Sequence, residues 1–473
     1  MKPGPINFYH PRLRLRAAER RIIMFLGDLL ASVLALGLAL VFWSQNDFLN
    51  LSWEFLNVRI PLWFYLLPIL WLFLNLDLYD TRRASRRRET LGGIMMSTGL
   101  SILLYLVVFF LSEPNSLPRR GVAIFIGTAA LFTLAWRLIY ISVFTQPAFL
   151  RRVLIVGAGK AGTRLAQVVA GLKPQPFLLV GLVDDDPAKL ESEVFGVPVL
   201  GSSVDLEIIV RREQITDIVV AISGIMQPEM FSALLRCAEN SVDITTMPVM
   251  YEELLGRVPI FLLQSDWLLR TFLDQARSRG FFEPAKRMVD IVGSLVGLVM
   301  LLLLFPLLAA LIILETGLPV LYRQERLGRN GKNYVMYKLR TMYTDAEKNG
   351  VQVTVTNDQR ITRVGRFLRK SHLDELPQFF NVLLGDMSLV GPRAEREQLV
   401  EKLQEDVPFY RARLLVKPGI TGWAQVNYGY ASTVQDTAIK LEYDLYYIKA
   451  RSLTLDIAIL FRTVRNVLGL QGR

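Results

Sequence analysis

The chain has 473 residues, of which 52% are hydrophobic and 21% are charged, and its formal net charge is +11. This length exceeds one ordinary domain, and the apolar content exceeds that of a soluble protein, so membrane segments are expected. A single cysteine, Cys237, and two histidines exclude a disulfide framework and a Cys/His zinc site within one chain. Any bound metal ion would therefore need oxygen ligands.

Four apolar runs each have the length that a helix needs to cross a bilayer: about 22–43, 61–79, 91–111 and 122–144. Arginines crowd the segment before the first run and the loop between the second and third. Positive residues favour the cytoplasmic side, so these flanks and everything after residue 150 are expected in the cytoplasm. Basic residues beside apolar runs also favour a lipid surface, not a nucleic acid, as their partner. We predict a four-helix transmembrane region over residues 1–148.

The pattern changes at Arg151, where a short β-branched strand runs into a glycine turn and then a helix, in the sequence RRVLIVGAGKAGTRLAQVVAGL. Gly157, Gly159 and Gly162 form the turn, as in a nucleotide-binding βαβ unit. The next strand ends at Asp184, about where a ribose-binding acid would lie. We predict a doubly wound, Rossmann-like domain over residues 149–265. A lone glycine fingerprint fits nucleotide binding and also a tight turn in a scaffold, and both interpretations stay open.

A fifth apolar run, at about 288–314, contains Pro306 in its middle and has basic residues on both flanks. Proline breaks the helical hydrogen-bond ladder, and two basic flanks place both ends of the run on the cytoplasmic side. We therefore predict a re-entrant hairpin at about 286–322, inside a C-terminal domain over residues 266–473. The alternative is a kinked transmembrane helix, which would place all later residues outside the cell.

The last apolar segment, LTLDIAILFRTVRNVLGL, repeats apolar residues at helical spacing, with Arg462 and Arg465 on the opposite face. Such a helix can lie in the membrane interface. It can equally well pack on the soluble domain. Periodicity does not separate these two interpretations.

The densest group of chemically useful residues is RKSHLDELPQFFNVLLGDMSLVGPRAERE, which contains the adjacent acids Asp374 and Glu375. A structural interpretation has even weight on spacing alone: Asp374 can cap a helix, with Pro377 in its first turn and Ser371 in a capping box. Cations on both sides favour a phosphate site instead. These cations are Lys338, Arg340, Arg363, Arg366, Arg369, Lys370 and Arg393.

An ionised carboxylate among cations can attack a phosphorus atom and form an acyl-phosphate intermediate, which is the role expected for Asp374. Glu375 would project about 100° around a helix from Asp374, close enough to share a magnesium ion. Magnesium would neutralise diphosphate charge and help the nucleotide to leave.

Residues 281–470 resemble the bacterial sugar transferases, the monotopic phosphoglycosyl transferases that start polysaccharide assembly on undecaprenyl phosphate. Several blocks typical of that family occur in order: FEPAKRMVDI, the proline-containing run, YRQERLGRNGKNYVMYKLRTM, LDELPQFFNVLLGDMSLVGPR, KPGITGWAQVN and YDLYYIKARSLTLDI. The four apolar runs and the nucleotide-type domain resemble the large members of the family. Two local departures are Ala394, where many members have a second proline, and His372, in a run of small residues.

The resemblance implies transfer of hexose-1-phosphate from a UDP-hexose to undecaprenyl phosphate, with release of UMP, as the first membrane step of exopolysaccharide, capsule or O-antigen synthesis. It implies a multi-pass protein of the bacterial inner membrane with cytoplasmic soluble domains, and the large soluble surfaces make a homodimer reasonable. It assigns Asp374 as nucleophile and Glu375 as magnesium partner. Phosphate contacts are expected from Lys338, Arg340, Arg369 and Arg393, and weaker candidates for the site are Asp386, Gln425 and Asp444.

The main alternative is a membrane-anchored nucleotide-sugar dehydratase or epimerase, which needs a second glycine fingerprint and a tyrosine-lysine pair. No second fingerprint follows a strand after residue 270. Tyr334 and Lys338 have the i, i+4 spacing, but NYVMYKLR alternates as a strand does, which would hold the two side chains about 13 Å apart.

Overall fold

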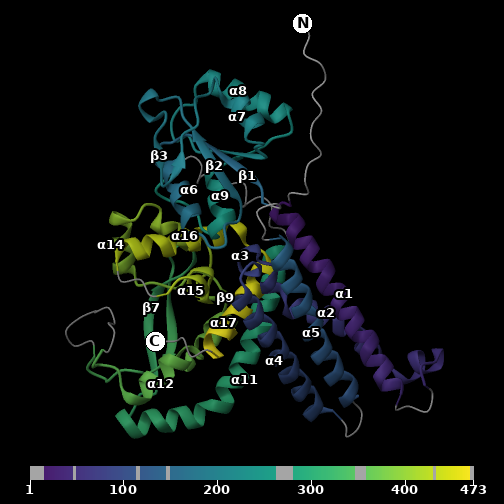
Figure 1. Cartoon of the computed structure of the whole chain (residues 1–473). Helices are drawn as coiled ribbons and strands as arrows, with labels where there is room; N and C mark the ends of the chain where they lie inside the picture. The colour runs from purple at the N-terminus through teal and green to yellow at the C-terminus, as the bar shows by residue number, and fades with distance from the viewer. Residues whose placement is uncertain are drawn as a thin grey trace. The chain divides into compact units, whose positions relative to one another are not determined.

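The structure is a computed structural model that describes residues 15–45, 50–112, 118–144, 150–262, 281–346, 358–429 and 433–468. By its internal contacts the chain divides into two units, Met1–Leu254 and Leu255–Arg473 (Figure 1). The first unit contains the N-terminal helices and a small α/β domain, and the second contains the cluster of acids and cations. Each part is described by itself below.

Three of the four N-terminal apolar runs form single helices long enough to cross a membrane: α1 (Ala17–Ser44), α4 (Arg87–Leu111) and α5 (Arg119–Phe144). Helices α1 and α5 meet at small, fully buried residues such as Ala35 and Ala129, as is common where helices approach closely in a bilayer. A fully buried ion pair joins the same helices, because Arg137 donates to Asp28 at 2.6 Å and 3.1 Å. A charge in such surroundings needs a partner.

The second apolar run is a series of short helices, not one long helix. It consists of η2 (Leu62–Leu66), α2 (Leu67–Leu74) and η3 (Leu76–Tyr79), preceded by η1 (Phe55–Arg59) and followed by α3 (Thr81–Ala84). Pro68 lies in the first turn of α2, where its missing N–H costs least, and Asn75 ends that helix. All four apolar runs are therefore helical, but the longest helix in the second run, α2, has only 8 residues.

The predicted parallel sheet is present. Its strand order is β2 (Leu178–Val183), β1 (Arg152–Val156), β5 (Asp217–Val220) and β6 (Asp243–Thr246), all parallel. Leu154 and Val156 of β1 face α7 (Leu206–Arg212) and α8 (Pro228–Glu239), whereas Ile155 faces α6 (Lys160–Gly171). Helices thus cover both faces of the sheet, as in a doubly wound domain. The domain is completed by η5 (Pro187–Lys189), the hairpin β3 (Glu193–Val194) and β4 (Val197–Pro198), and α9 (Met247–Leu255).

The C-terminal unit begins with the long helix α11 (Phe282–Thr316) and an antiparallel hairpin, β7 (Leu321–Leu327) and β8 (Asn333–Leu339), joined through η6 (Arg329–Gly331). Short elements follow: α12 (Arg363–Ser371), η7 (Leu373–Glu375), α13 (Gln378–Leu384), β9 (Ser388–Val390), α14 (Glu397–Asp406), η8 (Tyr410–Leu415), β10 (Gly419–Thr421) and α15 (Trp423–Asn427). The last helices are α16 (Val434–Ala450) and α17 (Leu453–Leu468).

One hydrophobic core holds these short elements together. Leu441, Leu445 and Ile448 of α16 are buried in it, together with Val382 of α13 and Leu389 of β9. Val258 and Ile260 belong to the same core, and the Val258 N–H donates to the Glu442 carbonyl oxygen at 3.0 Å. The segment that follows α9 is therefore part of the C-terminal unit.

Helix α11 does not stop at Pro306, so the predicted break in the helix is wrong. It runs for 35 residues with the proline inside, and Figure 1 shows it bending along its length. Proline removes only the hydrogen bond to the carbonyl four residues earlier, which lets a helix bend while the remaining bonds continue. Before the proline, Gly297 packs against Phe379 of α13; after it, Leu308 packs with Leu368 of α12.

Helix α17 packs on the C-terminal unit with one face. Asp456, Ile459 and Arg462 are buried there, and the Arg462 guanidinium donates to Asn427 Oδ1 at 2.9 Å and lies over the Trp423 ring. Of the two interpretations of this segment, the described contacts bear out packing on the domain.

Candidate active site

The acidic pair lies in a short turn between two helices. Helix α12 ends at Ser371, and His372 adopts a left-handed conformation with φ of 58° that redirects the chain into η7. Pro377 is the N-cap of α13, and the Ser371 hydroxyl donates to the Phe367 carbonyl oxygen at 2.9 Å. The capping box between Ser371 and Asp374 therefore does not form, and the helix-cap interpretation of Asp374 is wrong.

Two cations hold Glu375 in place. Lys338 Nζ and Arg393 Nη2 both lie 3.0 Å from Glu375 Oε1. Burial by itself would raise the pKa of Glu375, but the positive charges of Lys338 and Arg393 outweigh it and lower the pKa. Glu375 is consequently a fixed, ionised carboxylate at neutral pH.

Asp374 has a different environment, although it is the next residue towards the N-terminus. Its side chain is 7% exposed, and among the described residues no side chain or amide donates a hydrogen bond to it. Burial raises the pKa of Asp374 to about 6, and the charge on Glu375 acts in the same direction, against Lys338, Arg369 and Arg393. Asp374 is thus a largely ionised carboxylate whose oxygens are not engaged, which is what a nucleophile requires.

A second layer of contacts fixes Arg393. The Arg393 carbonyl oxygen accepts a hydrogen bond from Arg413 Nη2 at 3.0 Å, and Arg413 Nε donates to Asp444 Oδ2 at 2.9 Å. Tyr410 OH accepts from the same guanidinium at 2.6 Å. Asp444, a weaker candidate from the sequence, therefore does not touch the acids and acts through Arg413 on the backbone of Arg393.

The two remaining cations expected at the site, Arg369 and Arg340, have different partners. Arg369 Nε donates to Thr341 Oγ1 at 2.8 Å, and its charge acts on Asp374. Arg340 Nη2 instead donates to Thr316 Oγ1 at 2.6 Å and to the Gly317 carbonyl oxygen, at the end of α11. The structure therefore brings Arg369 to the acidic pair and uses Arg340 to secure the end of the long helix.

Two weaker candidates lie outside this group of contacts. Gln425 Nε2 donates to the Ile420 carbonyl oxygen at 3.0 Å and thereby ties α15 to β10. Asp386 follows the turn at Gly385, and its charge adds to the burial of the Tyr334 phenol in raising the pKa of that group. Neither has a contact with Asp374 or Glu375 among the described residues.

In the α/β domain, the side chain of Asp184 binds a backbone amide of the glycine turn. Asp184 accepts hydrogen bonds from the Ala158 amide at 2.6 Å and the Asp186 amide at 3.0 Å. Burial would raise the pKa of Asp184, but these amides and Lys189 lower it. A Cβ on Gly162 would lie 1.8 Å from the Gly157 carbonyl oxygen, so close packing accounts for this glycine. Gly157 has φ of 106°, which favours glycine, whereas space is open around Gly159.

No local pattern singles out Arg413. It lies in RARLL, where exposed Arg411 has the same chemical character, and only the fold turns one of the two arginines inwards. Asp444 was a candidate without a role, and its pairing with Arg413 supplies the role.

Comparison with known proteins identifies the family of the chain. Residues 281–470 match the bacterial sugar transferase family, and residues 75–248 match a CoA-binding domain family. The chain is 34% identical over 344 residues to the UDP-glucose:undecaprenyl-phosphate glucose-1-phosphate transferase of Xanthomonas campestris pv. campestris, covering 69% of this chain and 68% of that protein. This chain belongs to the bacterial sugar transferase family.

Two further bacterial sugar transferases are similar. The UDP-N-acetylgalactosamine-undecaprenyl-phosphate N-acetylgalactosaminephosphotransferase of Aeromonas hydrophila is 42% identical over 235 residues, covering 50% of this chain and 54% of that protein. The undecaprenyl-phosphate glucose phosphotransferase of Komagataeibacter xylinus is 33% identical over 323 residues, covering 67% of this chain and 59% of that protein. The alignment thus spans little more than half the length of these two relatives.

The dehydratase or epimerase alternative fails on geometry as well. Residues 333–339 form strand β8, in which Tyr334 pairs with Arg326 at one end of the ladder and Lys338 pairs with Tyr322 at the other. A tyrosine and a lysine so far apart along a strand cannot share one proton relay.

Proposed function

We propose that this bacterial sugar transferase moves hexose-1-phosphate from a UDP-hexose to undecaprenyl phosphate and releases UMP. The observation that carries the proposal is the contrast within the acidic pair. Glu375 is fixed by Lys338 and Arg393, while the Asp374 carboxylate is buried, unengaged by described donors and surrounded by positive charge. That arrangement suits attack on a diphosphate whose own charge the cations offset.

In the first step an Asp374 carboxylate oxygen attacks the β-phosphorus of UDP-hexose. A phosphorus–oxygen bond to Asp374 forms, and the bond from the β-phosphorus to the bridging oxygen breaks. UMP leaves with that oxygen and both electrons of the broken bond. The product on the enzyme is an acyl phosphate that joins Asp374 to the phosphohexose, and the total charge is unchanged because the carboxylate's charge passes to UMP.

In the second step an oxygen of undecaprenyl phosphate attacks the same phosphorus. The phosphorus–oxygen bond to Asp374 breaks, the carboxylate is restored, and undecaprenyl-diphosphate-hexose leaves. The same cations serve both steps, because each passes through a phosphorus centre carrying extra negative charge. The kinetics would be ping-pong.

Magnesium fits the residues present. No group of three or more acids, histidines or cysteines that could hold a metal occurs in the described part of the chain. Magnesium, however, is commonly held by one or two carboxylates, with water and substrate phosphates as its other ligands. Asp374 and the second carboxylate oxygen of Glu375 can supply these ligands. Bound there, the ion would neutralise charge on the diphosphate.

We further propose that α11 enters the cytoplasmic leaflet and returns. Gly297 packs on α13 and Leu308 packs on α12, and η7 joins these two short helices. From Gly297 to Leu308 the helix advances 11 residues, about 16 Å, against about 30 Å for a hydrocarbon core. Leu302 and Leu303, next to the bend, are exposed. This geometry supports a helix that dips into the membrane and keeps the soluble domains in the cytoplasm.

Competition among UDP-sugars would identify the hexose, because the relatives' names include both glucose and N-acetylgalactosamine. We place the reaction at the first membrane step of exopolysaccharide, capsule or O-antigen synthesis, in the inner membrane, with a homodimer as the expected assembly.

The test is the mass of the intact protein after mixing with UDP-hexose and magnesium, without acceptor. We expect an added phosphohexose, removed by undecaprenyl phosphate. Asp374→Asn should give no adduct, whereas Glu401→Gln, which removes an exposed acid of α14, should form it normally. Turnover without an adduct would favour direct transfer and overturn the covalent step.

A further inference from the structure

A cavity lined by basic residues lies in the C-terminal unit, and none of the residues around the acidic pair lines it. Its volume is about 30 Å³, and it is partly open to solvent. Of its ten lining residues five are basic: Lys286, Arg287, Arg329, Lys417 and Arg451. Two are acidic, Glu283 and Asp290. The cavity is formed by the start of α11, the turn before β10 and the end of α16.

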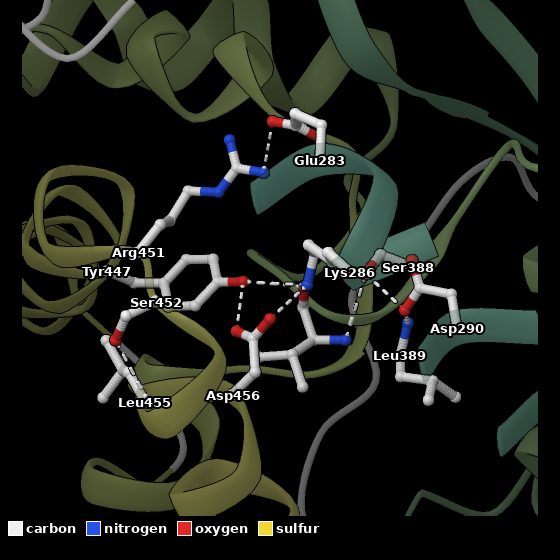
Figure 2. A network of polar contacts seen from close by, with 11 residues as sticks. Glu283, Lys286, Asp290, Ser388, Leu389, Tyr447, Arg451, Ser452, Leu455 and Asp456 are labelled. Atoms are coloured by element: carbon white, nitrogen blue, oxygen red, sulfur yellow. Dashed lines mark hydrogen bonds and ion pairs between the residues drawn. The ribbon is translucent and has the colours of Figure 1, made fainter. Parts of the chain in front are cut away.

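Two of the five cations are neutralised inside the protein, as Figure 2 shows. Lys286 Nζ lies 2.7 Å from Asp456 Oδ2, and Arg451 Nη2 lies 2.8 Å from Glu283 Oε1. Lys286 also donates to the Val390 carbonyl oxygen at 3.1 Å. This network neutralises Lys286 and Arg451 and forms one wall of the cavity.

Three cations remain, and they have no carboxylate within ion-pair distance in the part of the chain that the structure describes: Arg287, Arg329 and Lys417. Arg287 donates to the Val382 and Leu383 carbonyl oxygens at 2.7 Å each. The one further acid in the wall, Asp290, accepts bonds from Ser388 Oγ and the Leu389 amide at 2.9 Å each. The cavity therefore keeps an excess of positive charge.

Two of these cations lie close together, and Arg329 lines the same cavity. Lys417 Nζ and Arg287 Nη2 lie 3.5 Å and 3.6 Å from the point where a Cβ of Gly385 would be. Burial lowers the pKa of Lys417, and Arg287 and Arg329 lower it further, against Asp290 and Glu283. Like charges held together in a partly buried cavity destabilise one another, and an anion between them would remove that cost.

The cavity lies where α11 becomes apolar on its outside. Met288 is 65% exposed and Val292 is 57% exposed, and both follow Arg287 within two turns. If α11 enters the bilayer there, Arg287 and Lys417 lie at the depth of lipid headgroups, where phosphate is the abundant anion.

We propose that this cavity binds a phosphate group, with Lys417, Arg329 and Arg287 as its cationic partners. The headgroup of an anionic lipid and a free polyphosphate carry the same chemistry, and the position on α11 favours the lipid. Bound there, the lipid would secure the unit to the membrane surface without taking part in phosphosugar transfer.

The test follows the reactivity of single lysines in the full-length protein in detergent. An amine-acylating reagent is applied with dihexanoyl phosphatidic acid, with pyrophosphate, or with dihexanoylglycerol, which lacks phosphate, and labelling is read by mass spectrometry. We expect a phosphate-bearing probe to slow labelling of Lys417 by about tenfold, while exposed Lys402 is unaffected. Protection by phosphatidic acid alone identifies the lipid source, and protection by pyrophosphate identifies the free one.

A double variant tests the same cavity through its affinity for the protecting probe. Arg329→Met with Lys417→Met removes two cations without stranding a buried carboxylate, and should weaken binding of the protecting probe by about tenfold or more. The control, Arg211→Met with Lys402→Met, removes the same two charge types from exposed positions on α7 and α14. Equal affinity in both double variants, or equal protection of Lys417 and Lys402, overturns the proposal.

Discussion

Arg413 holds the backbone of Arg393: its Nη2 lies 3.0 Å from the Arg393 carbonyl oxygen, while the Arg393 side chain reaches Glu375 at the same distance. Arg413 is in turn bonded to the buried carboxylate of Asp444. A guanidinium with three fixed partners positions more precisely than a single ammonium can, because its donors form a rigid fork. The contact between Arg393 and Glu375 therefore depends on Arg413, which donates hydrogen bonds to Asp444, Tyr410 and the Arg393 backbone.

We expect Arg413→Lys to lower kcat for transfer by about tenfold to a hundredfold, because Lys cannot bond Asp444, Tyr410 and the Arg393 carbonyl oxygen together. In thermal unfolding, Arg413→Lys should lower the melting temperature less than Arg413→Met does, because Arg413→Met leaves Asp444 buried without a partner. Arg411→Lys, in the exposed neighbouring position, is the control and should behave as the parent. Unchanged kcat in Arg413→Lys would remove the positioning role.

The rate of adduct formation should depend on pH through Asp374. Its pKa is raised to about 6, and the attacking form is the ionised one, so the rate should be nearly constant above about pH 7. Below pH 6 it should fall about tenfold for each pH unit, as protonation removes the nucleophile. Rates of adduct formation at fixed magnesium, followed by rapid quenching and mass measurement, provide the profile.

Glu375→Gln tests the second cause of that raised pKa, the charge on Glu375, which adds to the larger effect of burial. Removing the neighbouring negative charge should lower the pKa of Asp374 and move the acid limb of the profile to lower pH, even if the absolute rate falls. An acid limb that stays at the parent's pH in Glu375→Gln would mean that the charge on Glu375 does not contribute to the raised pKa.

How far the sequence predicts this site depends on the kind of signal. The acidic pair and Lys338, Arg369 and Arg393 were predictable, because they lie within an ordered set of family blocks and their charges together favour a phosphate site. The direction of a side chain was not. Arg340 follows Lys338 by two residues, yet its partners are Thr316 and Gly317 at the end of a helix more than twenty residues earlier.

The continuity of α11 also escaped prediction, for a physical reason. Proline removes one hydrogen bond, and whether a helix ends or only bends there depends on what packs on either side. Here Gly297 and Leu308 both find partners in the same unit. Such tertiary contacts are not encoded in the local pattern around Pro306.

The glycine turn of the α/β domain gives a test that separates scaffold from nucleotide site. Gly162→Ala should destabilise the protein strongly, by about 3 kcal/mol or more, since the new Cβ would lie 1.8 Å from the Gly157 carbonyl oxygen. Gly159→Ala has open space and should change stability by less than about 1 kcal/mol. In a phosphate-binding turn, however, Gly159 would be the sensitive position, because backbone must approach the ligand there. Thermal unfolding with and without NAD, UMP or coenzyme A distinguishes the two; a nucleotide-dependent stabilisation lost in Gly159→Ala would contradict a scaffold.

The path of α11 through the membrane can be determined by labelling its two ends. In a Cys237→Ala background, Phe281→Cys and Leu318→Cys place thiols at positions that are 94% and 72% exposed, on either side of the helix. A helix that enters and returns leaves both thiols in the cytoplasm, so a membrane-impermeant maleimide should label neither in intact spheroplasts and both after permeabilisation. Arg119→Cys, at the start of α5 on the expected outer side, is the control that must react without permeabilisation. Labelling of Leu318→Cys but not Phe281→Cys in intact spheroplasts would instead mean that α11 crosses the bilayer and that Asp374 lies outside the cell, where UDP-hexose is not supplied.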